Sequence, residues 1–134
     1  IEELKAIVKD NNLENRVFFT GFVSDEQMAT IIQKTRIYVN ASYFEGFGMT
    51  SIEMMGSGIP TIVANNTAQK EVTMGLCRYY EPTNDKFKLA EQIIDEIKKP
   101  KSETELFEIA ETIKQRYSYE IVANKYWKFI EMCI

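Results

Sequence analysis

The chain has 134 residues, 45% hydrophobic and 27% charged, and this ordinary composition predicts a single globular domain over residues 1–134. The net charge of -4 argues against a nucleic-acid-binding protein, because such proteins usually carry a basic face. The chain has no histidine, which excludes histidine-based catalytic triads and most zinc sites within it. Its two cysteines lack metal-type spacing, and no apolar run is long enough to cross a bilayer.

The first part of the chain predicts a helix, a strand and a second helix. Residues 1–9 have the apolar periodicity of an amphipathic helix. The β-rich run RVFFT at residues 16–20 predicts a strand that ends at Gly21. A helix then begins at Ser24, because Ser24 and Gln27 have the spacing of a capping box.

The rest of the chain alternates between short apolar strands and helices. Such strands are typical of a sheet buried on both faces, and parallel strands need crossover connections, which the helices supply. The predicted class is therefore α/β with a parallel sheet. The predicted elements are strands at 36–41, 60–64 and 77–80, and helices at 50–55, near 72, at 87–98, from a cap at 102, and at 118–134.

The loop at residues 42–48, SYFEGFG, connects the predicted strand 36–41 to the predicted helix 50–55. In open α/β sheets, ligands bind beyond the carboxyl ends of the strands. Glycines let a ligand approach the backbone closely, and the free N–H groups and dipole at a helix start favour a phosphate. Glu45 precedes the glycines, and Glu53 follows eight residues later, in what the pattern predicts to be the first helical turn.

Simpler structural roles for the same residues stay open at this point. Thr50 and Glu53 have the spacing of a capping box, in which Glu53 would bond only the Thr50 amide. Glu45 fits an ordinary solvated loop acid equally well, and Gly46 and Gly48 fit a tight turn. Both the dinucleotide-binding glycine fingerprint and the P-loop are absent from the sequence. Spacing alone therefore predicts an anion-binding loop without naming the anion.

The segment EGFGMTSIEMMGSGIPTIVAN resembles the donor-binding motif of retaining glycosyltransferases of the GT-B type. Their two glutamates separated by seven residues are Glu45 and Glu53 here, followed by Gly58-Ile59-Pro60 and a hydrophobic strand. The runs RVFFTGFVSDEQM, RIYVNASYFEGFG, KEV and YSYEIVANKYWKFIE resemble the same family in the same order. The resemblance covers nearly the whole chain. It implies a Rossmann-like parallel sheet flanked by helices, the C-terminal half of a GT-B fold, truncated at its N-terminal edge.

The resemblance also implies a role for each part of the site. The catalytic residue would hydrogen-bond hydroxyls of the donor sugar, and other residues would hold the sugar, the diphosphate, the ribose and the nucleobase. These residues are Glu45 (catalytic), Gly46, Phe47, Gly48, Met49 and Thr50 (sugar and diphosphate), Glu53 (ribose), and Gly21, Phe22 and Val23 (nucleobase vicinity).

The function that the resemblance implies is retaining glycosyl transfer from a nucleotide-diphosphate sugar, in polysaccharide or glycoconjugate synthesis. The alternative is a non-catalytic nucleotide-sugar-binding module of the same fold. A flavodoxin-like or response-regulator-like domain is a third reading, but the sequence lacks its acidic cluster or phosphate-loop pattern. The intact pair of Glu45 and Glu53 favours the enzyme.

The partners implied are the nucleotide-sugar donor and a glycan or lipid-linked acceptor. The family binds the acceptor with an N-terminal domain, which would precede Ile1 together with an Arg and Lys pair for the diphosphate. The resemblance implies that the leaving diphosphate is stabilised by positive groups and the helix dipole, with no required metal or other cofactor, and the absence of an Asp-x-Asp motif is consistent with this. We expect no nucleic-acid partner and no transmembrane segment, and a cytoplasmic location, with any membrane association made through the N-terminal domain.

Overall fold

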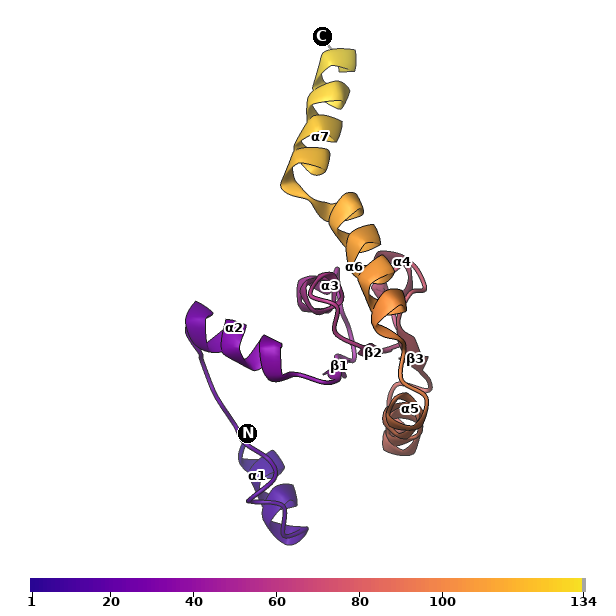
Figure 1. Cartoon of the computed structure of the whole chain (residues 1–134). Helices are drawn as coiled ribbons and strands as arrows, with labels where there is room; N and C mark the ends of the chain where they lie inside the picture. The colour runs from indigo at the N-terminus through magenta and orange to yellow at the C-terminus, as the bar shows by residue number, and fades with distance from the viewer. Residues whose placement is uncertain (134) are drawn as a thin grey trace. The chain divides into compact units, whose positions relative to one another are not determined.

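The computed structural model describes residues 1–133 and has two compact units, which meet in sequence between Gln33 and Lys34 (Figure 1). The first unit holds the helix α1 (Glu2–Asp10) and all but the last residue of α2 (Asp25–Lys34). The second unit holds the sheet and the remaining helices. The single domain expected over residues 1–134 stays a prediction.

Both helices of the first unit were predicted by the sequence and are confirmed. The start of α2 has the reciprocal bonds of a capping box: the Ser24 amide donates to Gln27 Oε1 at 2.9 Å, and the Gln27 amide donates to Ser24 Oγ at 3.3 Å. Neither α1 nor α2 contains a buried residue.

The strand predicted at residues 16–20 is wrong. Residues 17–20 have no regular secondary structure, and Phe18 is 77% exposed. A strand is stabilised by hydrogen bonds and side-chain pairs with a neighbouring strand. The β propensity of RVFFT is real, but in the described structure this segment is paired with no other strand.

The second unit is built on a parallel three-stranded sheet in the order β1-β2-β3. The strands β1 (Tyr38–Asn40), β2 (Thr61–Ala64) and β3 (Arg78–Tyr80) confirm the three other predicted strands, in slightly shorter form. Val39 pairs with Ile62 and Val63 with Tyr79. All four residues of β2 are buried, which explains why three of them, Ile62, Val63 and Ala64, are apolar.

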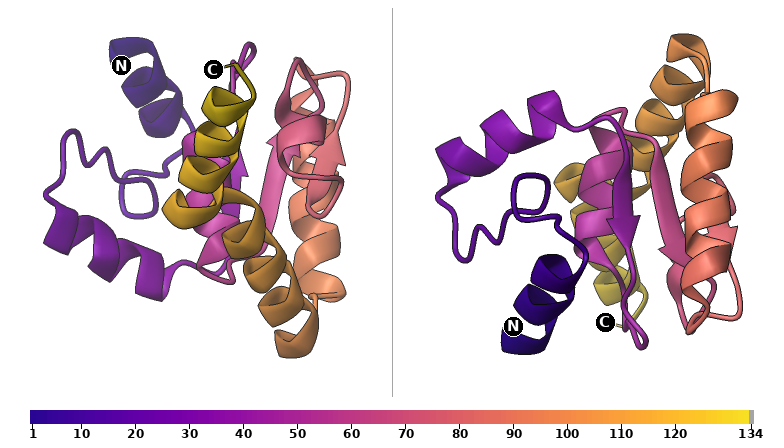
Figure 2. Two further views of the ribbon diagram at one scale, coloured as in Figure 1. Left: turned by 90° about the horizontal axis from the view of Figure 1, so that it is seen from above. Right: turned by 90° about the horizontal axis from the view of Figure 1, so that it is seen from below.

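Helices cover both faces of this sheet, as the α/β class predicts, and Figure 1 shows α3 and α5 on opposite sides of it. Ile62 and Ala64 pack with residues of α5, and Ile52 of α3 packs in a separate cluster with Ile113 of α6. Two views in Figure 2 show the same layering. The helices of this unit are α3 (Met49–Gly56), α4 (Gln69–Val72), α5 (Lys86–Lys98), α6 (Glu103–Tyr117) and α7 (Tyr119–Cys133).

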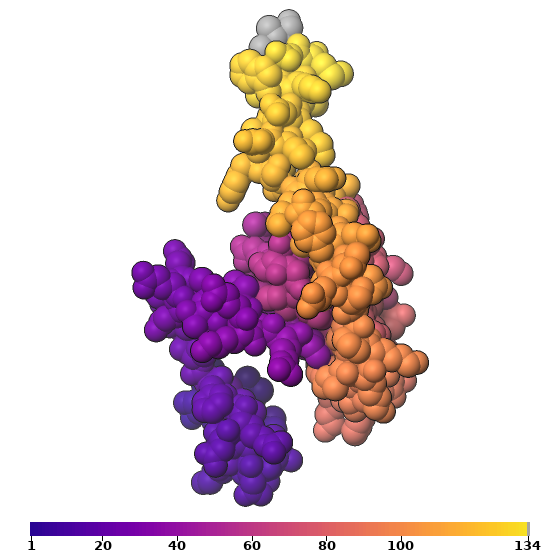
Figure 3. Space-filling model, viewed as in Figure 1, coloured from indigo at the N-terminus to yellow at the C-terminus, as the bar shows by residue number. Residues whose placement is uncertain are grey.

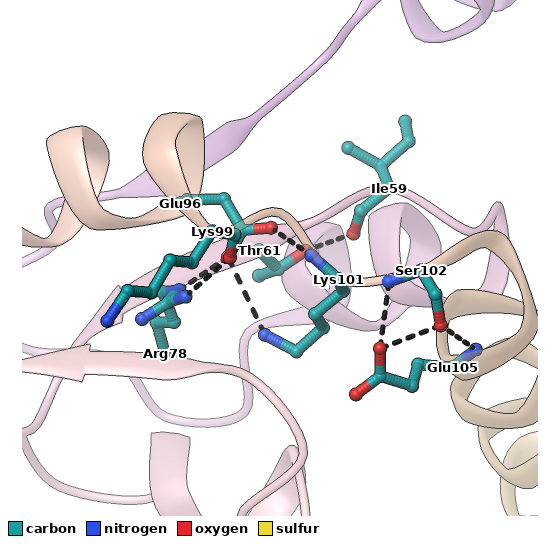
Figure 4. Close-up of polar contacts among 8 residues, drawn as sticks. All are labelled: Ile59, Thr61, Arg78, Glu96, Lys99, Lys101, Ser102 and Glu105. Atoms are coloured by element: carbon teal, nitrogen blue, oxygen red, sulfur yellow. Dashed lines mark hydrogen bonds and ion pairs between the residues drawn. The ribbon is translucent and has the colours of Figure 1, made fainter.

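Both helices predicted at the end of the chain are confirmed as α6 and α7, but only α6 packs against the sheet unit through buried residues. Ser102 and Glu105 form the expected capping box at the start of α6, with the Glu105 amide 3.2 Å from Ser102 Oγ and the Ser102 amide 2.8 Å from Glu105 Oε2 (Figure 4). The helix α6 packs on α3 through Ile113. In contrast, no residue of α7 is buried. Figure 3 shows the surface of this helix in yellow.

A buried carboxylate joins the end of α5 to β3. Glu96, only 2% exposed, accepts a short hydrogen bond from Arg78 Nε and another of 3.1 Å from the Lys101 amide, with Lys101 Nζ at 3.7 Å (Figure 4). Burial by itself would raise the pKa of Glu96, but the bonds from Arg78 and Lys101 outweigh it and hold the pKa below its usual range. The bonds of Glu96 to Arg78 and to the Lys101 amide thus hold α5 and the turn that follows it against β3.

Replacing Arg78 by Met should lower the unfolding free energy by about 3 kcal/mol, because it leaves the charge of Glu96 buried with only the Lys101 amide and the more distant Lys101 ammonium. Urea denaturation at neutral pH measures this change. The double variant Arg78→Met/Glu96→Met should recover most of the loss, because no charge is then left buried. Lys114→Met, which breaks an exposed pair with Glu111, is the matched control and should change little. A double variant as unstable as the single one would contradict this account.

Glu96 should also make the fold sensitive to acid. Its pKa is lower in the folded state than the ordinary value of 4.5, so the unfolded chain binds the proton at higher pH. The stabilisation is therefore complete above pH 4.5 and is lost as the pH falls through the folded pKa. Urea unfolding repeated at decreasing pH should show a steeper acid loss in the wild type than in Glu96→Gln. An equal loss of stability with falling pH in both proteins would show that carboxylates other than Glu96 cause the acid sensitivity.

Candidate functional site

The loop at residues 41–48 leaves the carboxyl end of β1 and enters α3, as predicted. Asn40, the last residue of β1, directs the exit: its Oδ1 accepts from the Ser42 amide at 2.9 Å, and its Nδ2 donates to Ser51 Oγ at 3.2 Å. Asn40 is buried, and its bond to Ser51 is shielded from water. A short polar network therefore joins the strand end to the first turn of α3.

Gly48 is the N-cap of α3, with φ at 81°, in the left-handed region that favours glycine. Its carbonyl accepts from the amides of Ser51 at 3.0 Å and Ile52 at 3.3 Å. No side chain caps α3, and its first turn holds no acidic residue. The start of α3 therefore has the free amides and positive dipole end that suit an anion.

Two expectations about Glu53 are corrected by this geometry. Because α3 begins at Met49, Glu53 is its fifth residue and lies beyond the first turn. Thr50 is not the N-cap, so the capping box of Thr50 and Glu53 does not form. Instead, Thr50 Oγ1 accepts from the Tyr38 hydroxyl at 2.8 Å. Glu53 is exposed, and its carboxylate makes no hydrogen bond or ion pair within residues 1–133.

The backbone of Glu45 is fixed by hydrogen bonds, whereas its carboxylate makes none in the described structure. The Glu45 amide donates to Thr67 Oγ1 at 3.2 Å, and Thr67 Oγ1 donates to the Glu45 carbonyl at 2.6 Å. The residue is half-buried, and its carboxylate has no partner in the part of the chain that the structure describes. A carboxylate on a fixed backbone is well placed to accept hydrogen bonds from a ligand.

The segment after β2 forms a support for the loop, and sequence analysis did not assign it a role. Asn66 Nδ2 donates to the carbonyls of Ser42 and Tyr43, the latter at 2.8 Å, and Thr67 holds Glu45 as described. Gln69, from the same segment, lies beside Gly48. We call Asn66, Thr67 and Gln69 the loop support. A usable signal was present, because these residues follow the carboxyl end of β2, the strand beside β1.

Sequence analysis assigned Phe47 to the site but did not predict its contact with Tyr117. Its ring meets the ring of Tyr117 of α6 edge to face, with centroids 5.7 Å apart. The Tyr117 hydroxyl donates to the Val72 carbonyl at 2.8 Å. The helix α6 therefore joins the end of α4 to the loop at residues 41–48, which we call the glycine loop. Of the predicted site residues, 45–48 lie on the loop, and Met49, Thr50 and Glu53 lie on α3, which follows it.

The predicted nucleobase residues Gly21, Phe22 and Val23 lie in the first unit. Gly21 has φ at 62°, and Phe22 is 98% exposed. Val23 and Thr20 line a mainly apolar pocket of about 430 Å³ with Gln27, Thr30 and Ile31 of α2. Their role near a nucleobase stays a prediction.

The structure gives no sign of a metal centre in the described residues, where no group of three or more His, Cys, Asp or Glu side chains could hold an ion. The expected absence of a cofactor remains a prediction. Across residues 1–133, no helix is both long and apolar enough to span a bilayer.

Known proteins resemble this chain in sequence and in fold. Mannosylfructose-phosphate synthase of Agrobacterium fabrum is 44% identical over 63 residues, which are 47% of this chain and 14% of that protein. Poly(glycerol-phosphate) alpha-glucosyltransferase of Bacillus subtilis is 28% identical over 119 residues, 87% of this chain and 17% of that protein. The chain therefore spans less than a fifth of either relative.

The structure of sucrose-phosphate synthase from Thermosynechococcus elongatus matches 98% of this chain and 34% of its own, with a TM-score of 0.84 and 24% identity. This match, with the parallel sheet flanked by helices, confirms the Rossmann-like C-terminal domain of a GT-B fold. The family model of glycosyl transferases group 1 matches residues 2–113. That match covers most of the sequence, and the chain therefore belongs to the group 1 glycosyl transferases.

Proposed function

We propose that the glycine loop and the start of α3 bind the diphosphate and sugar of a nucleotide-sugar donor, for glycosyl transfer with retention at the anomeric carbon. The observation that carries the proposal is the start of α3 itself. It has glycine as N-cap, no side-chain cap and no acid in its first turn, at the carboxyl edge of a parallel sheet.

The diphosphate would sit at the amides of Met49 and Thr50. The helix dipole places partial positive charge there, and no carboxylate in the first turn competes for it. As the bond to the sugar breaks, negative charge grows on the leaving diphosphate, and preorganised N–H donors lower the barrier for that change. The Gly46–Gly48 backbone would line the sugar and diphosphate, because glycines permit a close approach.

The two glutamates would serve the neutral parts of the donor. An ionised carboxylate only accepts hydrogen bonds and is repelled by phosphate, so it suits hydroxyl groups. Glu45, the proposed catalytic residue, precedes the glycines and would bind sugar hydroxyls. Glu53, exposed one turn into α3, would bind the ribose hydroxyls. Both carboxylates lack partners within the described residues, which leaves them available.

The remaining parts of the reaction lie outside this site. We propose that Gly21, Phe22 and Val23 lie near the nucleobase, and that an N-terminal domain supplies the acceptor site. An Arg and Lys pair for the diphosphate would come from a part of this same domain that precedes Ile1. The acceptor would be a glycan or a lipid-linked glycan, in polysaccharide or glycoconjugate synthesis. The proposal includes no metal, no nucleic acid and a cytoplasmic location. The names of the two relatives, a mannosylfructose-phosphate synthase and an alpha-glucosyltransferase, contain mannose and glucose, so GDP-mannose and UDP-glucose are chosen as one probe for each sugar.

Nucleoside diphosphates should shift the backbone amide NMR signals of Gly46 to Glu53 in the full chain, because the phosphates accept hydrogen bonds from the start of α3. Titrations with GDP and UDP measure this, with the α5 signals as internal control. A loop that stays silent at high nucleotide concentration would contradict the assignment.

Substitutions of Glu53 and Glu45 should have different effects on ligand affinity. Glu53→Gln should weaken both GDP and GDP-mannose, or UDP and UDP-glucose, about tenfold, since the ribose is common to each pair. Glu45→Gln should weaken only the nucleotide sugar, by a similar factor, because the nucleoside diphosphate lacks the sugar. Isothermal titration calorimetry on the full chain measures both.

Glu108→Gln, an exposed change on α6, is the matched control for these variants. Unchanged affinity in Glu53→Gln would leave its ribose role without support. Equal weakening of both ligands in Glu45→Gln would mean that Glu45 does not recognise the sugar.

A further inference from the structure

Gln69, the first residue of α4, has a buried side chain with no hydrogen-bond partner. It is 1% exposed, and neither Nε2 nor Oε1 is hydrogen-bonded within residues 1–133. Its backbone is fully engaged: the amide donates to the Asn66 carbonyl at 3.1 Å, and the carbonyl accepts from Thr73. A buried carboxamide that can donate two bonds and accept others is costly to leave unsatisfied, and such a group calls for an explanation.

The carboxamide of Gln69 lies against Gly48, the N-cap of α3. A Cβ added at Gly48 would come within 2.7 Å of Gln69 Nε2 and 3.0 Å of Oε1. The missing side chain of Gly48 is therefore what allows Gln69 to reach this point. The unsatisfied amide is thus aimed at the turn that leads into the proposed diphosphate site.

The loop support already holds the rest of the loop. Asn66 bonds the carbonyls of Ser42 and Tyr43, and Thr67 bonds the backbone of Glu45 on both sides. Gln69 contacts the next part of the same loop, but without a hydrogen bond. Of the three members of the loop support, it alone keeps its side-chain hydrogen-bonding capacity unused in the described structure.

We propose that Gln69 is a positioning residue for the donor: its carboxamide gains a hydrogen bond to the Gly46–Gly48 backbone when a nucleoside diphosphate occupies the start of α3. The inference rests on the proposed function and adds a residue to it. Gln69 acts through the turn and does not touch the ligand, since its amide atoms are enclosed. The turn can reorient at low cost because two of its three residues are glycines.

Such a bond links ligand binding to the state of the loop. The free protein carries an unsatisfied amide, and the bound protein does not, so the bond gained favours the bound state. If the carboxamide only filled space, a side chain of similar length without polar atoms would serve as well or better. Methionine is that side chain, which makes Gln69→Met the informative change.

The experiment uses the full chain and two readouts. In the wild type, GDP or UDP should shift the NMR signals of the Gln69 side-chain NH₂ group, whereas guanosine, which has no diphosphate, should leave them in place. Gln69→Met should keep or raise the urea midpoint and yet bind the nucleoside diphosphate about tenfold more weakly. Gln92→Met, on α5 and outside the loop support, should match the wild type in both.

The outcomes separate this inference from the proposed function. A wild type that binds neither GDP nor UDP would overturn both. A wild type that binds, with the Gln69 NH₂ signals unmoved and Gln69→Met equal in affinity, would overturn only the role of Gln69. A shift with guanosine as large as that with GDP would also overturn it. The NH₂ readout does not depend on the variant, so an unstable Gln69→Met would still leave a decisive measurement.

Discussion

Because all four residues of β2 are buried, its backbone must find hydrogen-bond partners inside the protein, and β1 and β3 supply them on either side. Burial on both faces also requires helices above and below, which α3 and α5 provide. The parallel pairing then brings the carboxyl ends of the strands to one edge. The glycine loop after β1 and the loop support after β2 meet there as a direct consequence.

At that edge, the two segments have complementary tasks. The glycine loop and the start of α3 present free backbone amides and the uncommitted carboxylates of Glu45, on the loop, and Glu53, on α3. Asn66 and Thr67 provide that support from the neighbouring strand end, through bonds to backbone atoms. Side chains that bond backbone atoms can order a loop without occupying the surface that faces the ligand.

Membership of the group 1 glycosyl transferases and this electrostatic arrangement support each other. Membership of a sequence family does not by itself explain why the loop before α3 of this chain is rich in glycine, or why Glu45 and Glu53 lie on either side of the helix start. The geometry offers a reason: the start of α3 is kept clear of negative charge, and the acids lie before it and one turn beyond it. Charged diphosphate and neutral hydroxyl groups would then meet groups of matching chemistry.

The sequence by itself determined the elements with strong local signals. The capping boxes at Ser24 and Ser102, the apolar run of β2 and the glycine loop ahead of α3 were all predicted, because caps, periodicity and turns depend on residues close in the chain. Tertiary structure alone decided that RVFFT stays unpaired, that Gly48 and not Thr50 caps α3, and that Gln69 lies against Gly48. These outcomes depend on which distant segments come into contact, and local spacing carries no information about that.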